Sequence, residues 1–223
     1  MAYSIAIDGP AGAGKSTIAK KIAKELSYIY VDTGAMYRAM ALYFLRKGIK
    51  PEEEERISEE CNNADITIEY KDGEQQVILN GENVNGLIRT EEVGNMASAT
   101  SVNGNVRKKM VELQQQLAQK ADVIMDGRDI GTKVLPMAEL KIYLTASSRT
   151  RAERRYKELQ DRNIECDIDV IEKDIIDRDY RDMNRENSPL MQAEDAVLVD
   201  SSDMNAEEVA AHIIQLFKEK ING

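Results

Sequence analysis

One short segment limits the fold of this 223-residue chain more than any other feature. Residues 9–17 read Gly-Pro-Ala-Gly-Ala-Gly-Lys-Ser-Thr, which matches the pattern GxxxxGK[ST] of a phosphate-binding loop (P-loop). Such a loop needs a strand before it and a helix after it. Residues 3–7 are a short apolar run, and apolar residues recur at helical spacing from 15 to 26. A second strand-like run follows at 28–31, so the order predicts a βαβ unit and a parallel sheet.

The residue types in this loop suit a triphosphate. Its glycines let the backbone turn tightly with N–H groups pointing inward, and the following helix adds the positive end of its dipole. Lys15 supplies an ammonium group for the β- and γ-phosphates, and the Ser16 hydroxyl is the expected ligand of Mg²⁺. We therefore predict that a nucleoside triphosphate with Mg²⁺ is bound by Gly9, Pro10, Ala11, Gly12, Ala13, Gly14, Lys15, Ser16 and Thr17.

The rest of the chain extends the sheet and carries an insertion. Buried-strand patterns recur at 123–126, 140–144 and 196–199, and helical patterns cover 35–47, 90–101, 106–120, 149–162, 169–185 and 206–221. Three short strand-like pieces at 65–70, 76–79 and 82–85 are separated by Asp72-Gly73 and Asn80-Gly81, dipeptides typical of hairpin turns. We expect an α/β fold: a five-stranded parallel sheet flanked by helices, a small antiparallel β insert and a helical lid.

Composition and charge exclude several classes of protein. The formal net charge is −10, whereas a general nucleic-acid binder would show a basic surface. No apolar run approaches the roughly 20 residues that span a bilayer, and the first residues do not form a basic, cleavable leader. Cys61 and Cys166 lie far apart, without a CxxC or Cys/His cluster. We expect a cytoplasmic monomer that binds neither nucleic acid nor membrane.

P-loops occur in GTPases, transporter ATPases and small-molecule kinases, and other residues separate these classes. The sequence has no NKxD-like guanine-binding motif and no LSGGQ-like signature. A small-molecule kinase needs a second anion site, and eight of the fourteen arginines fall between Arg149 and Arg185. Kinase activity is therefore favoured. The non-enzymatic alternative is a nucleotide-binding regulator without an acceptor.

Three further segments are candidates for the acceptor site. Residues 32–38 (Asp-Thr-Gly-Ala-Met-Tyr-Arg) and 126–129 (Asp-Gly-Arg-Asp) each follow a predicted strand, so both reach the carboxyl edge of the sheet, where α/β proteins bind ligands. Positions 178, 181, 182 and 185 share one face of a predicted helix and place three arginines beside a carboxylate. The alternative for this face is a salt-bridged surface exposed to solvent.

The order of these segments resembles the bacterial cytidylate kinase family over essentially the whole chain. The resemblance rests on GPAGAGKST, DTGAMYR, IRTEEVGNMAS, NVRKK, DGRDIGT, SSRTRAERR, RDYRDMNR and LVDSS, of which DTGAMYR and DGRDIGT are not general to P-loop proteins. It implies transfer of the γ-phosphoryl group of ATP to CMP, and also to dCMP, with Mg²⁺. A related kinase that uses UMP or AMP is the enzymatic alternative.

The resemblance also implies roles for single residues. It places CMP against Thr33, Tyr37, Arg38, Ser98, Arg107, Gly127, Arg128, Asp129, Arg178, Asp182 and Arg185. Within this set, Asp182 binds the ribose, and cytosine is read by Ser98, Arg107 and Asp129. These three side chains suit cytosine, because the base offers an amino donor and two acceptors, and the side chains supply both acceptors and donors. Phosphoryl transfer is assigned to Lys15, Arg128, Asp129 and Arg185, with Asp129 also considered as the proton acceptor. Asp8 and Asp126 are considered for orienting water around Mg²⁺.

The resemblance finally implies three parts of one kinase unit. The core covers 1–61, 121–147 and 187–223, the monophosphate-binding insert 62–120, and the lid with the arginine-rich helices 148–186. Residues 149–162 include few large apolar side chains, so we expect this segment to be mobile and not deeply buried. Bound ATP would then draw in Arg151, Arg154 and Arg155. The alternative is a static helix whose arginines pair with Glu153, Glu158 and Asp161.

Overall fold

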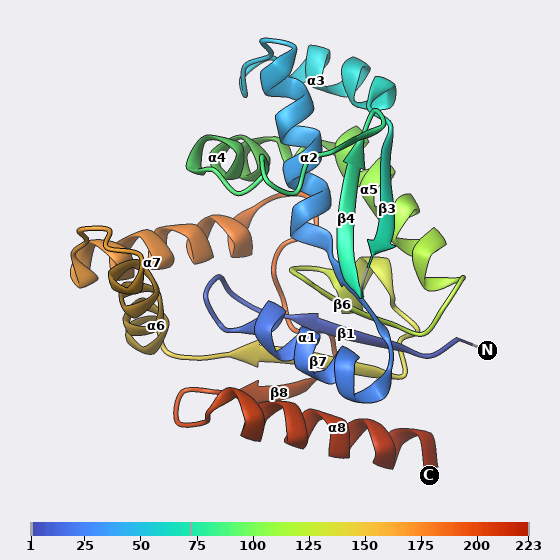
Figure 1. Ribbon diagram of the computed structural model, residues 1–223, viewed down its shortest axis with the longest axis vertical. Helices are drawn as coiled ribbons and strands as arrows, with labels where there is room; N and C mark the ends of the chain where they lie inside the picture. Colours follow the sequence, from blue (N-terminus) through green and yellow to red (C-terminus); the bar gives the residue numbers. More distant parts are fainter. Residues whose placement is uncertain (1, 72, 223) are drawn as a thin grey trace.

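The computed structural model describes residues 2–71 and 73–222 and shows a large and a small sheet flanked by helices (Figure 1). The large sheet has the strand order β2-β6-β1-β7-β8, and all its pairings are parallel. This result confirms the predicted five-stranded parallel sheet. Its strands are β1 (Ser4–Asp8), β2 (Ile29–Asp32), β6 (Val123–Gly127), β7 (Leu140–Thr145) and β8 (Val197–Asp200).

Helices cover both faces of the large sheet. On one face, α1 (Lys15–Leu26) and α8 (Ala206–Asn222) share a core with Ile5 of β1. On the other face, α2 (Thr33–Arg46) shares a core with Ala6, the next residue of the same strand. Because successive side chains of a strand point to opposite faces, a strand covered on both sides needs a continuous apolar run, as β1 has.

The small sheet confirms the predicted antiparallel insert. Its strands pair in the order β3-β4-β5, and Gly73 and Gly81 adopt positive φ angles of 78° and 81° in the turns. Asp72, the first residue of one predicted turn, lies outside the described residues. The elements of this region are α3 (Glu54–Glu60), a 3-10 turn (Cys61–Asn63), β3 (Ile66–Lys71), β4 (Glu74–Leu79), β5 (Glu82–Asn83), α4 (Glu91–Thr100) and α5 (Gly104–Ala118).

Side chains attach the small sheet to β2, which is an edge strand of the large sheet. Gln75 of β4 accepts a hydrogen bond from the Asp32 N–H (2.7 Å) and donates one to the Asp32 carbonyl oxygen (3.2 Å). The Tyr70 hydroxyl donates to the Tyr30 carbonyl oxygen (3.1 Å), and Arg89 pairs with the Asp32 carboxylate (2.5 Å). The insert is thus fixed at the point where β2 ends.

Two charged helices, α6 (Ser148–Asp161) and α7 (Ile168–Asn184), lie beyond the carboxyl ends of the strands, at the left of Figure 1. The prediction that residues 149–162 are not deeply buried is wrong at two positions, because Arg151 is only 5% exposed and Ala152 is fully buried. In the part of the chain that the structure describes, no helix combines the length and apolar character needed to cross a membrane.

Candidate active site

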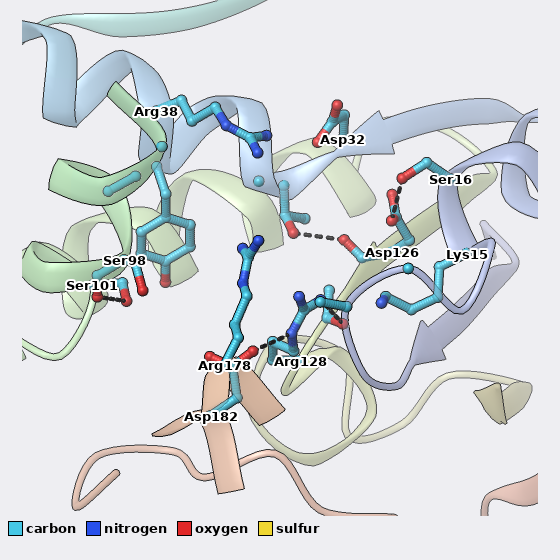
Figure 2. A pocket seen from close by; sticks show the side chains of 18 of the residues that line it. Lys15, Ser16, Asp32, Arg38, Ser98, Ser101, Asp126, Arg128, Arg178 and Asp182 are labelled. Carbon is cyan, nitrogen blue, oxygen red and sulfur yellow. Dashed lines mark hydrogen bonds and ion pairs between the residues drawn. The ribbon is translucent and has the colours of Figure 1, made fainter. Parts of the chain in front are cut away.

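A cavity of about 640 Å³ lies at the carboxyl edge of the large sheet (Figure 2). The P-loop, the ends of β2 and β6, and residues of α4 to α7 line it. The structure brings together in this cavity the predicted residues Ala11, Gly12, Gly14, Lys15, Ser16, Thr17, Thr33, Tyr37, Arg38, Ser98, Arg107, Gly127, Arg128, Asp129, Arg151, Arg154, Arg155, Arg178, Asp182 and Arg185. Gly9, Pro10 and Ala13 belong to the loop but do not line the cavity.

The P-loop has little room for side chains at its first glycine. Gly9 has a φ of 147°, and a Cβ atom there would lie 1.9 Å from the Leu144 carbonyl oxygen of β7. Lys15 follows the loop as the first residue of α1; its side chain is buried, and Nζ donates to the Pro10 carbonyl oxygen (2.6 Å). Burial lowers the pKa of Lys15, and nearby Arg128 lowers it further. The loop therefore holds its cation in place beside the cavity.

The Asp126 carboxylate at the end of β6 accepts two hydrogen bonds. Ser16 Oγ donates to Oδ2 and the Tyr30 hydroxyl donates to Oδ1, each over 2.8 Å. Burial raises the pKa of Asp126, and the charge of Asp32 adds to this effect. A hydroxyl beside a carboxylate gives the oxygen donors that Mg²⁺ prefers, and in kinases this ion is also held by substrate phosphates. Ser16 and Asp126 therefore fit the predicted metal.

Asp8, at the end of β1, has both carboxylate oxygens occupied by backbone donors. They accept the N–H groups of Ile130 (2.8 Å) and Gly131 (2.7 Å), which begin a π-helical turn, Ile130–Val134. Burial raises the pKa of Asp8 to about 6, although the two backbone hydrogen bonds act in the opposite direction. Asp8 thus anchors the loop that carries Arg128 and Asp129. Its role in orienting water around Mg²⁺ stays a prediction.

Two arginines converge on the cavity from opposite walls. Arg38 of α2 and Arg178 of α7 point toward each other in Figure 2. Within residues 2–71 and 73–222, neither has a carboxylate oxygen within the 4.0 Å of an ion pair. Burial lowers the pKa of Arg38, and the like charge of Arg89 lowers it further. An anion bound between Arg38 and Arg178 would offset the repulsion among these positive charges. A guanidinium group can also bind a phosphate through two parallel hydrogen bonds.

Asp182 of α7 fixes Arg128 on the wall of the cavity. Arg128 Nε donates to Asp182 Oδ2 over 2.8 Å. Burial alone would raise the pKa of Asp182, but Arg128 beside it holds the pKa below its usual value. On the neighbouring wall, the Thr33 hydroxyl donates to the Asp126 carbonyl oxygen (2.6 Å). Both contacts orient side chains that the sequence assigned to the acceptor.

A buried ion pair forms another wall of the cavity. Arg107 of α5 pairs with Asp129, and their side chains are only 7% and 8% exposed. The Arg107 guanidinium lies over the Tyr37 ring, 5.8 Å from its centre. Arg185 Nη2 lies 3.8 Å from the second Asp129 oxygen and forms no hydrogen bond with the described residues. Together with Ser98, these groups offer both donors and acceptors to a ligand.

The cavity is also lined by Asp32, Gly34 and Asp126, which belong to the predicted acceptor-site segments 32–38 and 126–129. Its remaining lining residues were not predicted from the sequence as site residues: Arg89, Gly94, Ala97, Ser101 and Glu158. Ser101 had a detectable signal, because it lies three residues after Ser98 on a predicted helix. Its hydroxyl donates to the Ser98 carbonyl oxygen (3.0 Å), and its own carbonyl accepts from Arg107 (3.1 Å). Arg181, expected on the same face as Arg178, is exposed and does not line the cavity.

Solved structures support the fold. The chain aligns with an uncharacterized protein from Eubacterium ventriosum (TM-score 0.54, 12% identity, 98% of this chain and 99% of that chain). It also aligns with a shikimate kinase from Bacteroides thetaiotaomicron (TM-score 0.50, 13% identity, 97% and 98%). At such low identity these similarities concern the architecture alone.

Sequence comparisons are more specific. A family model described as cytidylate kinase matches residues 5–219. The chain is 50% identical to the cytidylate kinase of Caldicellulosiruptor bescii, covering 96% of this chain and 95% of that one. The corresponding values are 49%, 97% and 96% for the enzyme of Enterococcus faecalis, and 47%, 97% and 97% for that of Bacillus subtilis. The family match over residues 5–219 and the identity of about half over nearly the whole of each chain lead to one conclusion: the chain belongs to the cytidylate kinase family.

Proposed function

We propose that this protein transfers the γ-phosphoryl group of ATP to CMP, and also to dCMP, giving ADP and the nucleoside diphosphate. The observation that carries the proposal is one cavity that joins the P-loop to the facing Arg38 and Arg178 side chains. A triphosphate site and a second anion site in the same cavity are what a phosphoryl transfer between two nucleotides requires. Membership of the cytidylate kinase family supports CMP as the acceptor.

On the donor side, we propose that the backbone of residues 9–17 and the Lys15 ammonium group bind the ATP phosphates. Ser16 and Asp126 would hold Mg²⁺, which when bound neutralises charge on the β- and γ-phosphates. Arg154 and Arg155 of α6 also line the cavity. Arg154 donates to the Ser201 carbonyl oxygen (2.6 Å) and Arg155 pairs with Glu158 (2.7 Å); both contacts would have to change for these arginines to reach phosphate.

On the acceptor side, we propose that Arg38 and Arg178 grip the CMP phosphate, supported by Thr33, Arg128 and Arg185. Asp182 would accept from a ribose hydroxyl. Cytosine would be read by Ser98, Arg107 and Asp129 beside the Tyr37 ring. Because Asp129 is already paired with Arg107, we assign it to the base and not to proton abstraction.

Catalysis would then depend on alignment and charge. Phosphoryl transfer passes through a loose transition state whose equatorial oxygens carry the charge, so cations at both ends of the transferred group lower the barrier. Lys15 stands on the donor side, and Arg128 and Arg185 stand on the acceptor side. No side chain needs to remove a proton before the transfer begins.

A coupled assay of ADP release with CMP, dCMP, UMP and AMP tests the proposal. We expect the highest kcat/KM with CMP, phosphorylation of dCMP as well, and much lower values with UMP and AMP. A preference for UMP or AMP would point to a different nucleoside monophosphate kinase, and a lack of ADP release with every acceptor would point to a non-enzymatic regulator. The monomeric state, the cytoplasmic location and the division into core, insert and lid remain predictions; sedimentation velocity tests the first.

A further inference from the structure

The P-loop is held at one residue, Ala11, by side chains of α6 and α7. Arg151 Nη1 of α6 donates to the Ala11 carbonyl oxygen (2.8 Å), and Asp179 Oδ1 of α7 accepts from the Ala11 N–H (3.3 Å). Arg151 Nη2 and Asp179 Oδ2 form an ion pair of 2.6 Å. The three contacts close a ring that joins segments 140 and 168 residues away from the loop, and Figure 1 shows the loop after β1 reaching toward these helices.

Each of the three guanidinium nitrogens of Arg151 already has a partner, and these contacts use three of its five N–H donors. Its Nε donates to the Ala146 carbonyl oxygen (2.9 Å), so all three guanidinium nitrogens are engaged. The side chain is 6% exposed and packs on the loop so closely that a Cβ atom on Gly12 would lie 3.4 Å from Arg151 Cβ. Charge-assisted hydrogen bonds of a buried guanidinium group are among the stronger contacts in a protein. Arg151 therefore differs from Arg154 and Arg155, which lie nearer the surface.

Asp179 is the unexpected member of this ring. Its side chain is 12% exposed, it lies outside the set of cavity-lining residues, and it brings a negative charge to a loop that would bind a triphosphate. A carboxylate at this distance opposes the binding of an anion if charge alone is considered. Any favourable contribution of Asp179 to triphosphate binding must then come from the hydrogen bond that it accepts from Ala11 and from the position in which it holds Arg151.

We propose that Arg151 and Asp179 are positioning residues that hold Ala11, and through it the P-loop, in the shape that binds ATP. On this account Arg151 acts on ATP through the loop and is not a phosphate ligand. The inference rests on the proposed function, because it takes ATP as the ligand of the loop. It assigns a part in ATP binding to an acidic residue that does not line the cavity.

We call the contacts of Arg151 and Asp179 with Ala11 the clamp. The direction in which ATP affinity changes when the Asp179 charge is removed distinguishes the clamp from direct binding of phosphate by Arg151. If Arg151 were a phosphate ligand restrained by Asp179, then removing the Asp179 charge would free the arginine and reduce repulsion, so ATP would bind more tightly. If the pair shapes the loop, the same change loosens Ala11, and ATP binds more weakly although a negative charge has been removed.

The test compares ATP binding by calorimetry in the unaltered protein, in Asp179→Asn and in a control, Asp177→Asn, which removes an exposed carboxylate from the same helix. We expect Asp179→Asn to bind ATP roughly 10-fold more weakly, as loss of a hydrogen-bonded charge usually does, while KM for CMP stays the same. Asp177→Asn should match the unaltered protein. Equal or tighter ATP binding by Asp179→Asn overturns the proposal.

A double-variant cycle adds a second readout. Because the two residues act as one unit, the double variant Arg151→Gln with Asp179→Asn should bind ATP no more weakly than the weaker-binding single variant. If the residues acted independently, the fold-losses of ATP affinity in the two single variants would multiply in the double variant. Should the variants fail to fold, hydrogen exchange in the unaltered, nucleotide-free protein decides: a slowly exchanging Ala11 amide supports the clamp, and a freely exchanging one overturns it. The proposed function fails separately, if the unaltered protein neither binds ATP nor phosphorylates CMP.

Discussion

Asp8→Asn should change how the stability of the protein depends on pH. Asp8 is buried, and its pKa in the folded protein is about 6, compared with 3.8 for the free side chain. Because the folded state holds the proton more tightly than the unfolded state, the stability from this group is full below 3.8 and is lost as the pH rises through about 6. The difference corresponds to about 3 kcal/mol. Asparagine does not ionise, so the stability of the variant does not decrease with pH through this group.

Urea unfolding of both proteins between pH 4 and pH 7.5 measures the effect. As the pH rises over this range, the free energy of unfolding of the unaltered protein should fall relative to that of Asp8→Asn. The fall should reach most of the total of about 3 kcal/mol. Asparagine can accept only one of the two backbone hydrogen bonds well, which shifts the whole curve by a constant amount. Asp177→Asn controls for the change in net charge. A stability difference between Asp8→Asn and the unaltered protein that is the same at every pH would refute the reasoning.

Further predictions concern the two ends of the cavity and the lid. Lys15→Ala should lower kcat by roughly 100-fold or more in a folded protein, because its charge acts on the transferring group; near-normal turnover would remove Lys15 from the mechanism. Ser98→Ala should lower kcat/KM for CMP more than for UMP, since a lost polar partner of a buried base costs ~1–3 kcal/mol; equal losses would contradict its role in reading the base. Amide hydrogen exchange over 148–165 should slow on binding a bisubstrate analogue around Arg154 and Arg155 but change little at the already buried Arg151. Unchanged protection throughout would favour a static helix.

The fold could be predicted well because its signals are local. Apolar runs give the buried strands, the GxxxxGK[ST] pattern marks the turn after the first of them, and the Asn80-Gly81 dipeptide marks a hairpin. The π-helical turn at Ile130–Val134 had no such signal. It depends on Asp8, 122 residues away from Ile130, which supplies acceptors to two backbone N–H groups.

The candidate site was predictable in its members but not in their pairing. Spacing and the family resemblance assigned Arg38, Arg128 and Arg178 to the acceptor site. Only the fold shows that Arg128 pairs with Asp182, whereas Arg38 and Arg178 form no ion pair within residues 2–71 and 73–222. Arg151 was predicted as a residue of the ATP side, but its burial was not. A helix with few apolar residues is expected to remain at the surface, but a guanidinium group can be buried when all its nitrogens find partners, and these partners come from distant segments.

The attachment of the insert through Gln75 also affects how the protein behaves among its own copies. An uncovered edge strand offers a row of free N–H and C=O groups to which another chain can add a strand, the first step toward aggregation. At Asp32 the side-chain amide of Gln75 occupies both backbone groups, as a neighbouring strand would, but it cannot extend the ladder to a further chain. Gln75 therefore blocks strand addition at the last residue of β2, and loss of its amide would leave the two Asp32 backbone groups open to pairing with a partly unfolded copy.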